Sequence, residues 1–328
     1  MILGEGHARA GAAWVALTPN TRGALWLLAS AMLFTVMAVL AKFLGGRLDS
    51  LQVAFFRLLF GLIVILPFLM RGGIGMFKTH YPVLQLVRGV VGSTAMLCGF
   101  YALIHLPLAD ALAYNFTKAL FVVPLAYVML GEAAGPRRIG AVAIGFVGVL
   151  IMLRPTVEIA PAALVALAGA MLVALATMLV KIVHRDAPVT LMFYTGVVGT
   201  CVAAVPAYLV WQDPTWTELG LLLLMGASGA GAHNCFIRGY REGEASAIVP
   251  FDYSRLVFAG IAGFAVFGDV PDLMTIAGAL IIVATTLYIA RREAQAAKAM
   301  ADGASPTPAA GDGDAVAPGT PGYTPPRT

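Results

Sequence analysis

The chain has 328 residues, of which 60% are hydrophobic and 12% charged, with a mean hydropathy of +0.87 and a formal net charge of +4. Because about a quarter of the residues in soluble domains are charged, this composition excludes an ordinary soluble protein and indicates a membrane protein. The positive charge lacks the basic stripe with interleaved aromatics that nucleic-acid binding requires, so it indicates basic loops at a membrane surface.

The N-terminal segment, residues 1–22, mixes polar and apolar side chains and lacks the apolar core of a cleavable signal peptide. The first membrane span is therefore expected to remain as an anchor. Ten apolar segments follow, each near the length of about 20 residues that crosses a bilayer. We predict spans at 23–41, 52–70, 86–105, 109–130, 138–153, 161–182, 190–210, 217–237, 245–266 and 273–290. This pattern predicts an all-α integral membrane protein.

Some residues of the second and third spans have ordinary interpretations. Arg57 and Arg88 lie near predicted span ends, where a long basic side chain usually snorkels toward the interface. Gly92 and Gly99 are expected to allow close packing between helices. None of these four residues is expected to contact a solute.

The fourth span places polar side chains in the middle of the bilayer. Asp110, Tyr114, Lys118 and Phe121 recur at helical spacing and share one face, with Asn115 at its edge. Lys118 lies about nine residues into the span, near mid-bilayer, where a cation is costly and by default marks a functional site. Lys118 is therefore expected to contact solute or gate a cavity. The alternative is that it caps carbonyls or pairs with a carboxylate to lock the helices.

The ninth span repeats this order of residue types 137 positions later. Asn115-Phe116-Thr117-Lys118 corresponds to Asp252-Tyr253-Ser254-Arg255, and Gly131-Glu132 corresponds to Gly268-Asp269. Asp252 and Arg255 are three residues apart and can pair, which lowers the cost of burying both. We expect Arg255 to contact solute or gate the cavity. Asp252 either poises Arg255 or carries a proton, or else it serves only as the partner of Arg255.

Three further features surround these segments. His233 in the eighth span lines the same space, or else it is a satisfied packing residue. Pro124 and Pro250 free a backbone carbonyl and allow a kink or local unwinding beside the polar residues. Glu132 and Asp269, next to glycines at helix ends, are expected to serve turn geometry.

Five spans in each half is an odd number, so the second copy must enter the membrane upside down relative to the first. The fourth and ninth spans then run antiparallel about a pseudo-two-fold axis in the membrane plane. Inverted repeats of this kind occur in many secondary transporters, whose solute site lies near the midplane at the repeat interface. The two cations are thus expected to reach similar depth from opposite directions.

The loop charges predict the orientation. Thirteen bases lie near span ends on the side that holds both termini: Arg9, Arg22, Arg71, Lys78, Arg137, Arg138, Lys181, Arg185, Arg238, Arg241, Arg291, Arg292 and Lys298. Three lie on the other side: Lys42, Arg47 and Arg154. By the positive-inside rule, both termini are expected in the cytoplasm, with the protein in the bacterial inner membrane.

The expected organisation is a cytoplasmic segment 1–22, repeats 23–155 and 156–292, and a tail 293–328. The tail is rich in Ala, Gly, Pro, Thr and Asp and is expected to be disordered and cytoplasmic. Three cysteines lie in apolar runs and match no metal site, so they are expected to be core residues: Cys98, Cys201 and Cys235.

The chain has no catalytic motif and no nucleotide-binding loop, so no cofactor or metal is expected and an ATP-driven pump is disfavoured. The non-transport alternatives are an intramembrane enzyme and a membrane scaffold. An enzyme needs a carboxylate pair, a metal cluster or a nucleophile beside a base, and a scaffold has little use for charges in mid-membrane.

Several segments resemble the EamA branch of the drug/metabolite transporter superfamily. In the first half these are Leu106-Pro107-Leu108-Ala109-Asp110-Ala111, Asn115-Phe116-Thr117-Lys118 and Leu130-Gly131-Glu132. In the second half they are Pro250-Phe251-Asp252-Tyr253-Ser254-Arg255-Leu256-Val257 and Phe267-Gly268-Asp269-Val270-Pro271-Asp272. The resemblance implies ten helices in two inverted five-helix repeats around a central cavity with alternating access. It also implies that the third, fourth, eighth and ninth spans line that cavity.

We therefore predict a secondary active transporter of a small polar or amphipathic metabolite, acting as an amino-acid or metabolite exporter. The alternative is uptake of a cofactor-like metabolite such as riboflavin or S-adenosylmethionine. The expected partners are an anionic or zwitterionic small solute, the lipid bilayer and a second copy in a homodimer. The residues expected to bind solute or gate the cavity are Lys118, Arg255, Asn115, Asp252, Tyr253, Tyr114 and His233.

Overall fold

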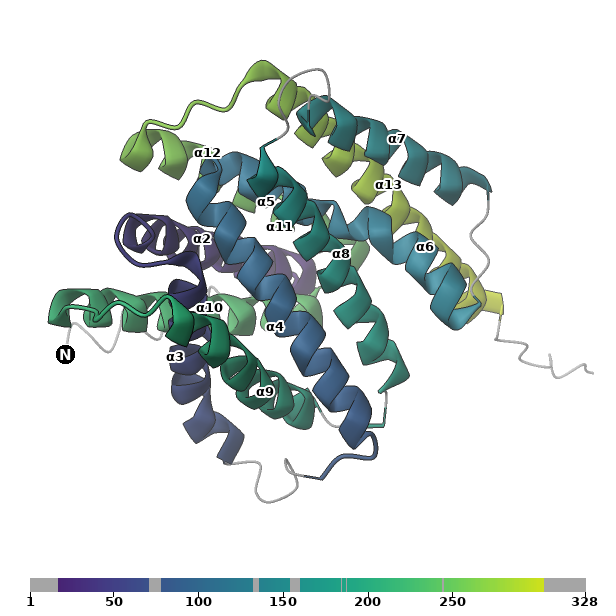
Figure 1. Ribbon diagram of the computed structural model, residues 1–328. Coiled ribbons are helices and arrows are strands. Elements are labelled where there is room, and N and C mark those ends of the chain that lie inside the picture. The colour runs from purple at the N-terminus through teal and green to yellow at the C-terminus, as the bar shows by residue number, and fades with distance from the viewer. Residues whose placement is uncertain are drawn as a thin grey trace, which may run out of the picture.

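The computed structural model describes residues 17–70, 78–131, 136–153, 160–183, 185–186, 188–243 and 245–303, and all regular structure in these ranges is helical (Figure 1). The helices are α2 (Pro19–Leu44), α3 (Ser50–Met70), α4 (Pro82–His105), α5 (Leu108–Phe116), α6 (Lys118–Leu130), α7 (Pro136–Leu153), α8 (Pro161–Ile182), α9 (Pro188–Leu209), α10 (Trp216–Glu242), α11 (Ala245–Asp252), α12 (Ser254–Phe267) and α13 (Leu273–Gly303). Each of the ten predicted spans has a helical counterpart, and the prediction of an all-α membrane protein is confirmed.

Length and apolar composition single out the membrane-crossing segments. In the described residues eight segments are long and apolar enough to cross a bilayer, and Ile139–Leu153 is a shorter apolar helix. The ninth predicted span, which comprises α11 of 8 residues and α12 of 14 residues, is not among the eight. Helices satisfy their own backbone hydrogen bonds, which is what a bilayer core demands of a crossing segment.

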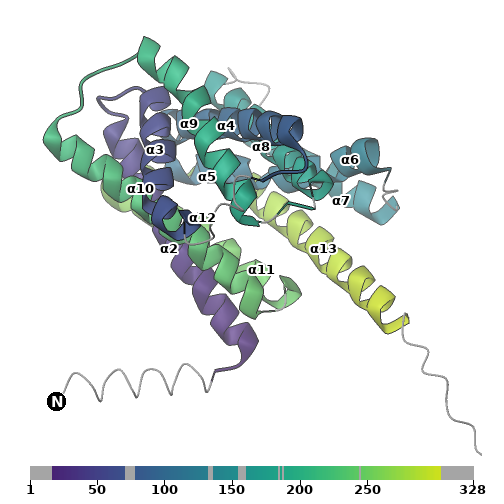
Figure 2. The same ribbon diagram turned by 90° about the horizontal axis from the view of Figure 1, so that it is seen from below.

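The packed helix pairs follow the repeat: when the two halves are exchanged, each pair corresponds to another observed pair. α2 packs against α10 as α8 packs against α4, and α3 packs against α10 as α9 packs against α4. Likewise α12 packs against α2 as α6 packs against α8, while α7 and α13 close their halves against each other (Figures 1 and 2). Because five spans precede the second repeat, this exchange relates the halves by inversion across the membrane, as the sequence predicts.

Both matched spans break at the matched segment. Thr117 separates α5 from α6, and Tyr253 separates α11 from α12. Around each residue the backbone makes the tighter three-residue bonds, Thr117 N–H to Tyr114 C=O at 3.1 Å and Tyr253 N–H to Pro250 C=O at 3.3 Å. A break in the helix beside the polar residues is therefore present, as a tighter turn and not as the predicted unwinding. Its cause differs between the halves, since Tyr253 follows Pro250 by three residues while Thr117 lies seven residues before Pro124.

Two glycines record the same repeat in the backbone. Gly131 ends α6 with φ of 67° and Gly268 ends α12 with φ of 70°, the left-handed conformation that glycine adopts without steric cost. They are 137 residues apart, as are the two matched segments.

One element departs from the sequence analysis. α13 continues to Gly303, ten residues beyond the predicted start of the disordered tail at 293. The residues after Arg292 are Glu, Ala, Gln and Lys, which are strong helix formers, so the helix extends past its apolar part. Residues 304–328, with the rest of the predicted tail, lie outside the described residues, as do residues 1–16.

Candidate solute-binding site

The break between α11 and α12 creates an ion pair inside the bundle. Arg255 Nη2 donates to Asp252 Oδ1 at 2.7 Å, and the two side chains are only 11% and 15% exposed. The Arg255 guanidinium carbon lies 4.0 Å from the centre of the Phe34 ring on α2. The predicted pairing is therefore present. Arg255 Nε is buried and has no hydrogen-bond acceptor in the described part of the chain, so the guanidinium keeps binding capacity.

Arg255 and Asn115 line one cavity of about 240 Å³ between α2, α4, α5, α8 and α12. Apolar side chains form most of its wall, including Phe34 and Met37. Gly92 and Gly99 also line it, and a Cβ at either position would meet no atom within 4 Å. The expectation that these glycines allow close helix packing is thus wrong, because they leave open space that faces the cavity.

Lys118 is the first residue of α6 and is not among the residues that line the 240 Å³ cavity. Within the described residues its ammonium makes no hydrogen bond and no ion pair, although Arg255 and Asp252 lie close enough to act on it electrostatically. Repulsion from Arg255 opposes attraction to Asp252 at this position. The alternative in which Lys118 locks helices through an ion pair finds no partner in the described structure.

The aromatic residues of the two matched segments meet. The rings of Phe116 and Tyr253, which occupy equivalent positions in the two repeats, lie 4.8 Å apart at an interplanar angle of 35°. Tyr114 is 4% exposed and belongs to the buried apolar cluster around α5. Tyr253 and Tyr114 are not among the residues that line the 240 Å³ cavity. Both pack in the apolar cluster that includes the cavity-lining residues Ala38, Leu103 and Ala111.

A second cavity of about 460 Å³ adjoins the first, and Met96 lines both. Its polar lining comes from Arg57, Arg88, Thr195 and His233. His233 also stacks on Phe236, with ring centres 6.4 Å apart. The structure therefore places the predicted His233 against a cavity next to the one that holds Arg255.

The expectation that Arg57 and Arg88 snorkel is wrong. Arg88 is 7% exposed, and its Nη2 donates to Leu191 C=O and to Thr195 Oγ1, each at 2.6 Å. Arg57 lies inside the bundle, where its Nε contacts Met37 Sδ at 3.2 Å. The sequence underestimated the depth of Arg57 because α3 begins at Ser50, before the predicted start at 52.

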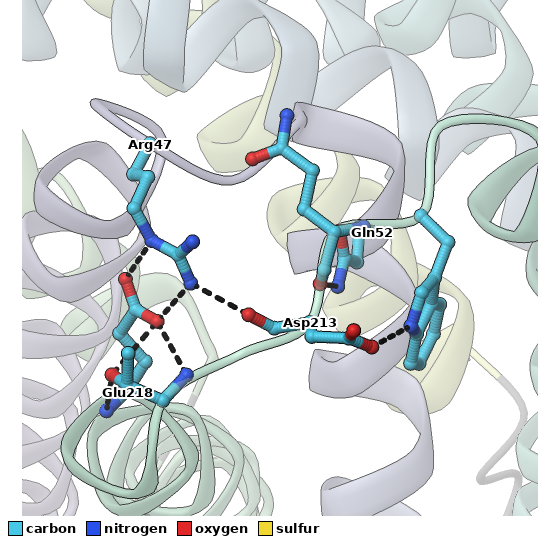
Figure 3. A network of polar contacts seen from close by, with 7 residues as sticks. Arg47, Gln52, Asp213 and Glu218 are labelled. Atoms are coloured by element: carbon cyan, nitrogen blue, oxygen red, sulfur yellow. Dashed lines mark hydrogen bonds and ion pairs between the residues drawn. The ribbon is translucent and has the colours of Figure 1, made fainter.

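Polar networks tie the connections together at both ends of α9. At one end the carboxylate of Glu218 accepts two bonds from Arg47, which also donates to Asp213 C=O at 3.0 Å (Figure 3). The bonds to Glu218 raise the pKa of Arg47 above its ordinary value. Gln52 exchanges two hydrogen bonds with the Gln212 backbone, at 2.6 and 3.0 Å.

The network at the other end of α9 centres on a buried carboxylate. Asp186 accepts from the His80 backbone N–H at 2.9 Å, from Gln85 Nε2 at 2.8 Å and from Thr79 Oγ1. Burial opposes its ionisation, yet these hydrogen bonds hold the pKa of Asp186 well below its ordinary value. Exchange of the halves relates the two networks. The first joins the start of α3, the second span of one half, to the start of α10, the third span of the other half, and the second joins the start of α9 to the start of α4 in the same way.

Asp269 does more than shape its turn. It forms an ion pair with Lys42 of α2 and accepts a hydrogen bond from Leu108 N–H at 3.2 Å. Lys42 also donates to Leu106 C=O at 3.1 Å, so α2, α5 and α12 are joined at one end of the bundle. The expectation of a purely local role for Asp269 is wrong. Its counterpart Glu132 lies outside the described residues.

Comparison with known proteins places this architecture. A sequence model of the EamA-like transporter family matches residues 21–154 and again residues 160–291. The S-adenosylmethionine uptake transporter of Rickettsia bellii is 34% identical over 283 residues, covering 86% of this chain and 97% of the relative. The riboflavin transporter of Rhizobium johnstonii is 31% identical, covering 83% of this chain and 91% of the relative.

Two further matches extend the comparison. The pseudopaline exporter CntI of Pseudomonas aeruginosa is 29% identical, covering 82% of this chain and 96% of the relative. A crystal structure of another protein matches with a TM-score of 0.58 at 18% identity, covering 83% of this chain and 99% of that chain, which shows the fold alone. With its two matched repeats and its cavities between them, the chain belongs to the EamA-like transporter family and is a multi-pass membrane transporter of a small metabolite.

Proposed function

We propose that this transporter binds a zwitterionic metabolite with a flat ring in the cavity beside the Arg255–Asp252 pair and moves it by alternating access. The observation that carries the proposal is that Arg255 lines this cavity while Asp252 is its partner. An ion pair offers both signs of charge at one point, which suits a solute that carries a carboxylate and an ammonium. The cycle needs no catalytic step.

S-adenosylmethionine is the first solute to test. It carries an amino-acid end with both charges, a sulfonium cation that the Asp252 carboxylate can attract, and a flat adenine ring, which suits the aromatic wall provided by Phe34. The match between this chain and the S-adenosylmethionine uptake transporter of Rickettsia bellii covers 97% of that relative. Its name supports the uptake alternative of the sequence analysis.

Export of a carboxylate-rich metabolite is the second candidate. The observation in its favour is that Lys118 makes no ion pair in the described structure, so the site carries more positive than negative charge. The relationship to a pseudopaline exporter supports the same direction. Export as the direction of transport stays a prediction, because alternating access carries a solute in either direction down its gradient.

Exchange of labelled S-adenosylmethionine across proteoliposomes tests the proposal. We expect the wild type to accumulate label by counterflow. Lys118→Met and Arg255→Met should each reduce it by at least about 10-fold, the loss expected for one charge-assisted hydrogen bond. Arg241→Met removes an equal charge at the exposed end of α10 and should leave exchange unchanged. Unchanged exchange in both Lys118→Met and Arg255→Met would exclude this site.

The proposed setting is the bacterial inner membrane with both termini in the cytoplasm. The excess of bases on the side of the termini supports this orientation. Reporter fusions after residue 303 and within the connection between α9 and α10 distinguish the two orientations. The homodimer stays a prediction, which light scattering in detergent checks.

A further inference from the structure

A second buried arginine stands at the larger cavity without an anion. Arg57 lies seven residues into α3, about 10 Å along the helix, and lines the 460 Å³ cavity with His233 and Arg88. Its only hydrogen-bond acceptor among the described residues is Met37 Sδ, a weak acceptor at 3.2 Å. A guanidinium has five N–H donors, so most of its capacity is unused.

Two glycines make room for this guanidinium. A Cβ at Gly229 of α10 would overlap Nε, Nη2 and Cζ of Arg57, and a Cβ at Gly61 of α3 would overlap Nη1. The guanidinium therefore lies across two side-chain-free backbone positions on neighbouring helices. Any larger residue at Gly229 forces it to move.

The cavity supplies no negative charge to balance Arg57. No Asp or Glu is among the described residues that line it. Arg88 is already bound to Gln85, Leu191 and Thr195, so it does not compete for an incoming group. Isolated cations inside a membrane are costly and are usually paired or face a solute path.

We propose that Arg57 is an anion subsite that binds a carboxylate of the transported solute in the larger cavity. The planar fork of a guanidinium matches a carboxylate through two parallel hydrogen bonds. Because Met96 lines both cavities, a solute whose carboxylate is held at Arg57 can extend its cationic part and its ring toward the Arg255–Asp252 pair. This assigns the carboxylate to Arg57 and leaves the cationic part of the solute to Asp252. The inference rests on the proposed transport function and names which of its residues selects the carboxylate.

Binding of S-adenosylmethionine and of its decarboxylated analogue to the purified full chain tests the subsite. The wild type should bind the carboxylate form about 10- to 100-fold more tightly, the value expected for a charge-assisted bidentate contact. Arg57→Met should bind both forms equally. Gly229→Ala keeps the charge but displaces the guanidinium, and should lose the discrimination as well.

Matched controls separate displacement from general damage. Gly220→Ala lies on the same helix where a Cβ meets no atom within 4 Å, and it should keep the discrimination. Arg241→Met should also keep it. Should Arg57→Met fail to fold, Arg57→Lys and Gly229→Ala carry the test, with Arg57→Lys showing intermediate discrimination. A folded variant at either Arg57 or Gly229 that discriminates as well as the wild type overturns the subsite and leaves the transport proposal standing.

Absence of S-adenosylmethionine binding to the wild type would exclude that solute, and malonate then decides the subsite. Malonate should raise the melting temperature of the wild type and of Arg241→Met but not that of Arg57→Met. A malonate effect independent of Arg57, or no malonate effect at all, overturns the subsite.

Discussion

Single polar residues in this protein differ in whether the fold already satisfies them. Asp186, Arg88 and Asp269 each have several hydrogen-bond or ion-pair partners within the protein, so their charges stabilise the fold. Arg57 and Lys118 have almost none in the described chain. Because a buried charge without a partner is costly, the second group points to the solute path and the first to the framework.

Asp186 allows a prediction about pH. Asp186→Asn replaces one carboxylate oxygen, which accepts hydrogen bonds from Thr79 and Gln85, by an NH2 group that can only donate. This change should cost roughly 1–3 kcal/mol of stability. The pKa of Asp186 is lower in the folded state than in the unfolded state, where it is near 3.9. The carboxylate therefore stabilises the fold fully at pH values above the unfolded pKa, and this stabilisation is lost only as pH falls through the lower folded pKa. The difference in melting temperature between wild type and variant should therefore not shrink as pH falls from 8 to 5.

Asp213→Asn provides the control for this measurement. Asp213 is an exposed carboxylate at the opposite end of α9, and among the described residues its carboxylate accepts only from Trp211 Nε1, at 3.1 Å. Its replacement should change the melting temperature little. A difference for Asp186→Asn that disappears between pH 8 and pH 5 would contradict the assigned ionisation.

At the scale of elements, the same devices occur twice. Each matched span breaks at the same place, ends in a left-handed glycine and packs against the first helix of the other half. The breaks place Lys118 and Arg255 at the first turns of α6 and α12, so the same kind of helix break positions both cations. The repeated fold thus builds one site from two copies of one element.

The two end glycines give a prediction at this scale. Gly131→Ala and Gly268→Ala should each cost about 1–2 kcal/mol, because an L-residue is strained at positive φ although the space around both positions is open. Gly220→Ala, in an open helical position, should be neutral or stabilising. Thermal unfolding in detergent measures all three. Equal melting temperatures for Gly131→Ala and Gly220→Ala would show that the left-handed cap is unimportant.

For the whole molecule, hydropathy and repetition were sufficient to predict the ten helical spans, the inverted halves and the position of Arg255 at a cavity. Periodicity could not reveal which side chains find partners. Arg57 looked like a snorkelling residue, because its depth depends on where α3 starts. Gly92 and Gly99 looked like packing residues, because whether a glycine meets a neighbour or a cavity is decided by helices distant in sequence.

The central claim is that solute passes through the cavity between the two halves. Gly92→Trp fills this cavity from a position where nothing lies within 4 Å, without removing any polar group. Counterflow of S-adenosylmethionine in proteoliposomes should fall by at least about 10-fold in this variant, since a blocked cavity loses its binding contacts. Gly220→Trp, at an exposed position of α10, should transport normally. Full exchange by correctly folded Gly92→Trp would contradict the account.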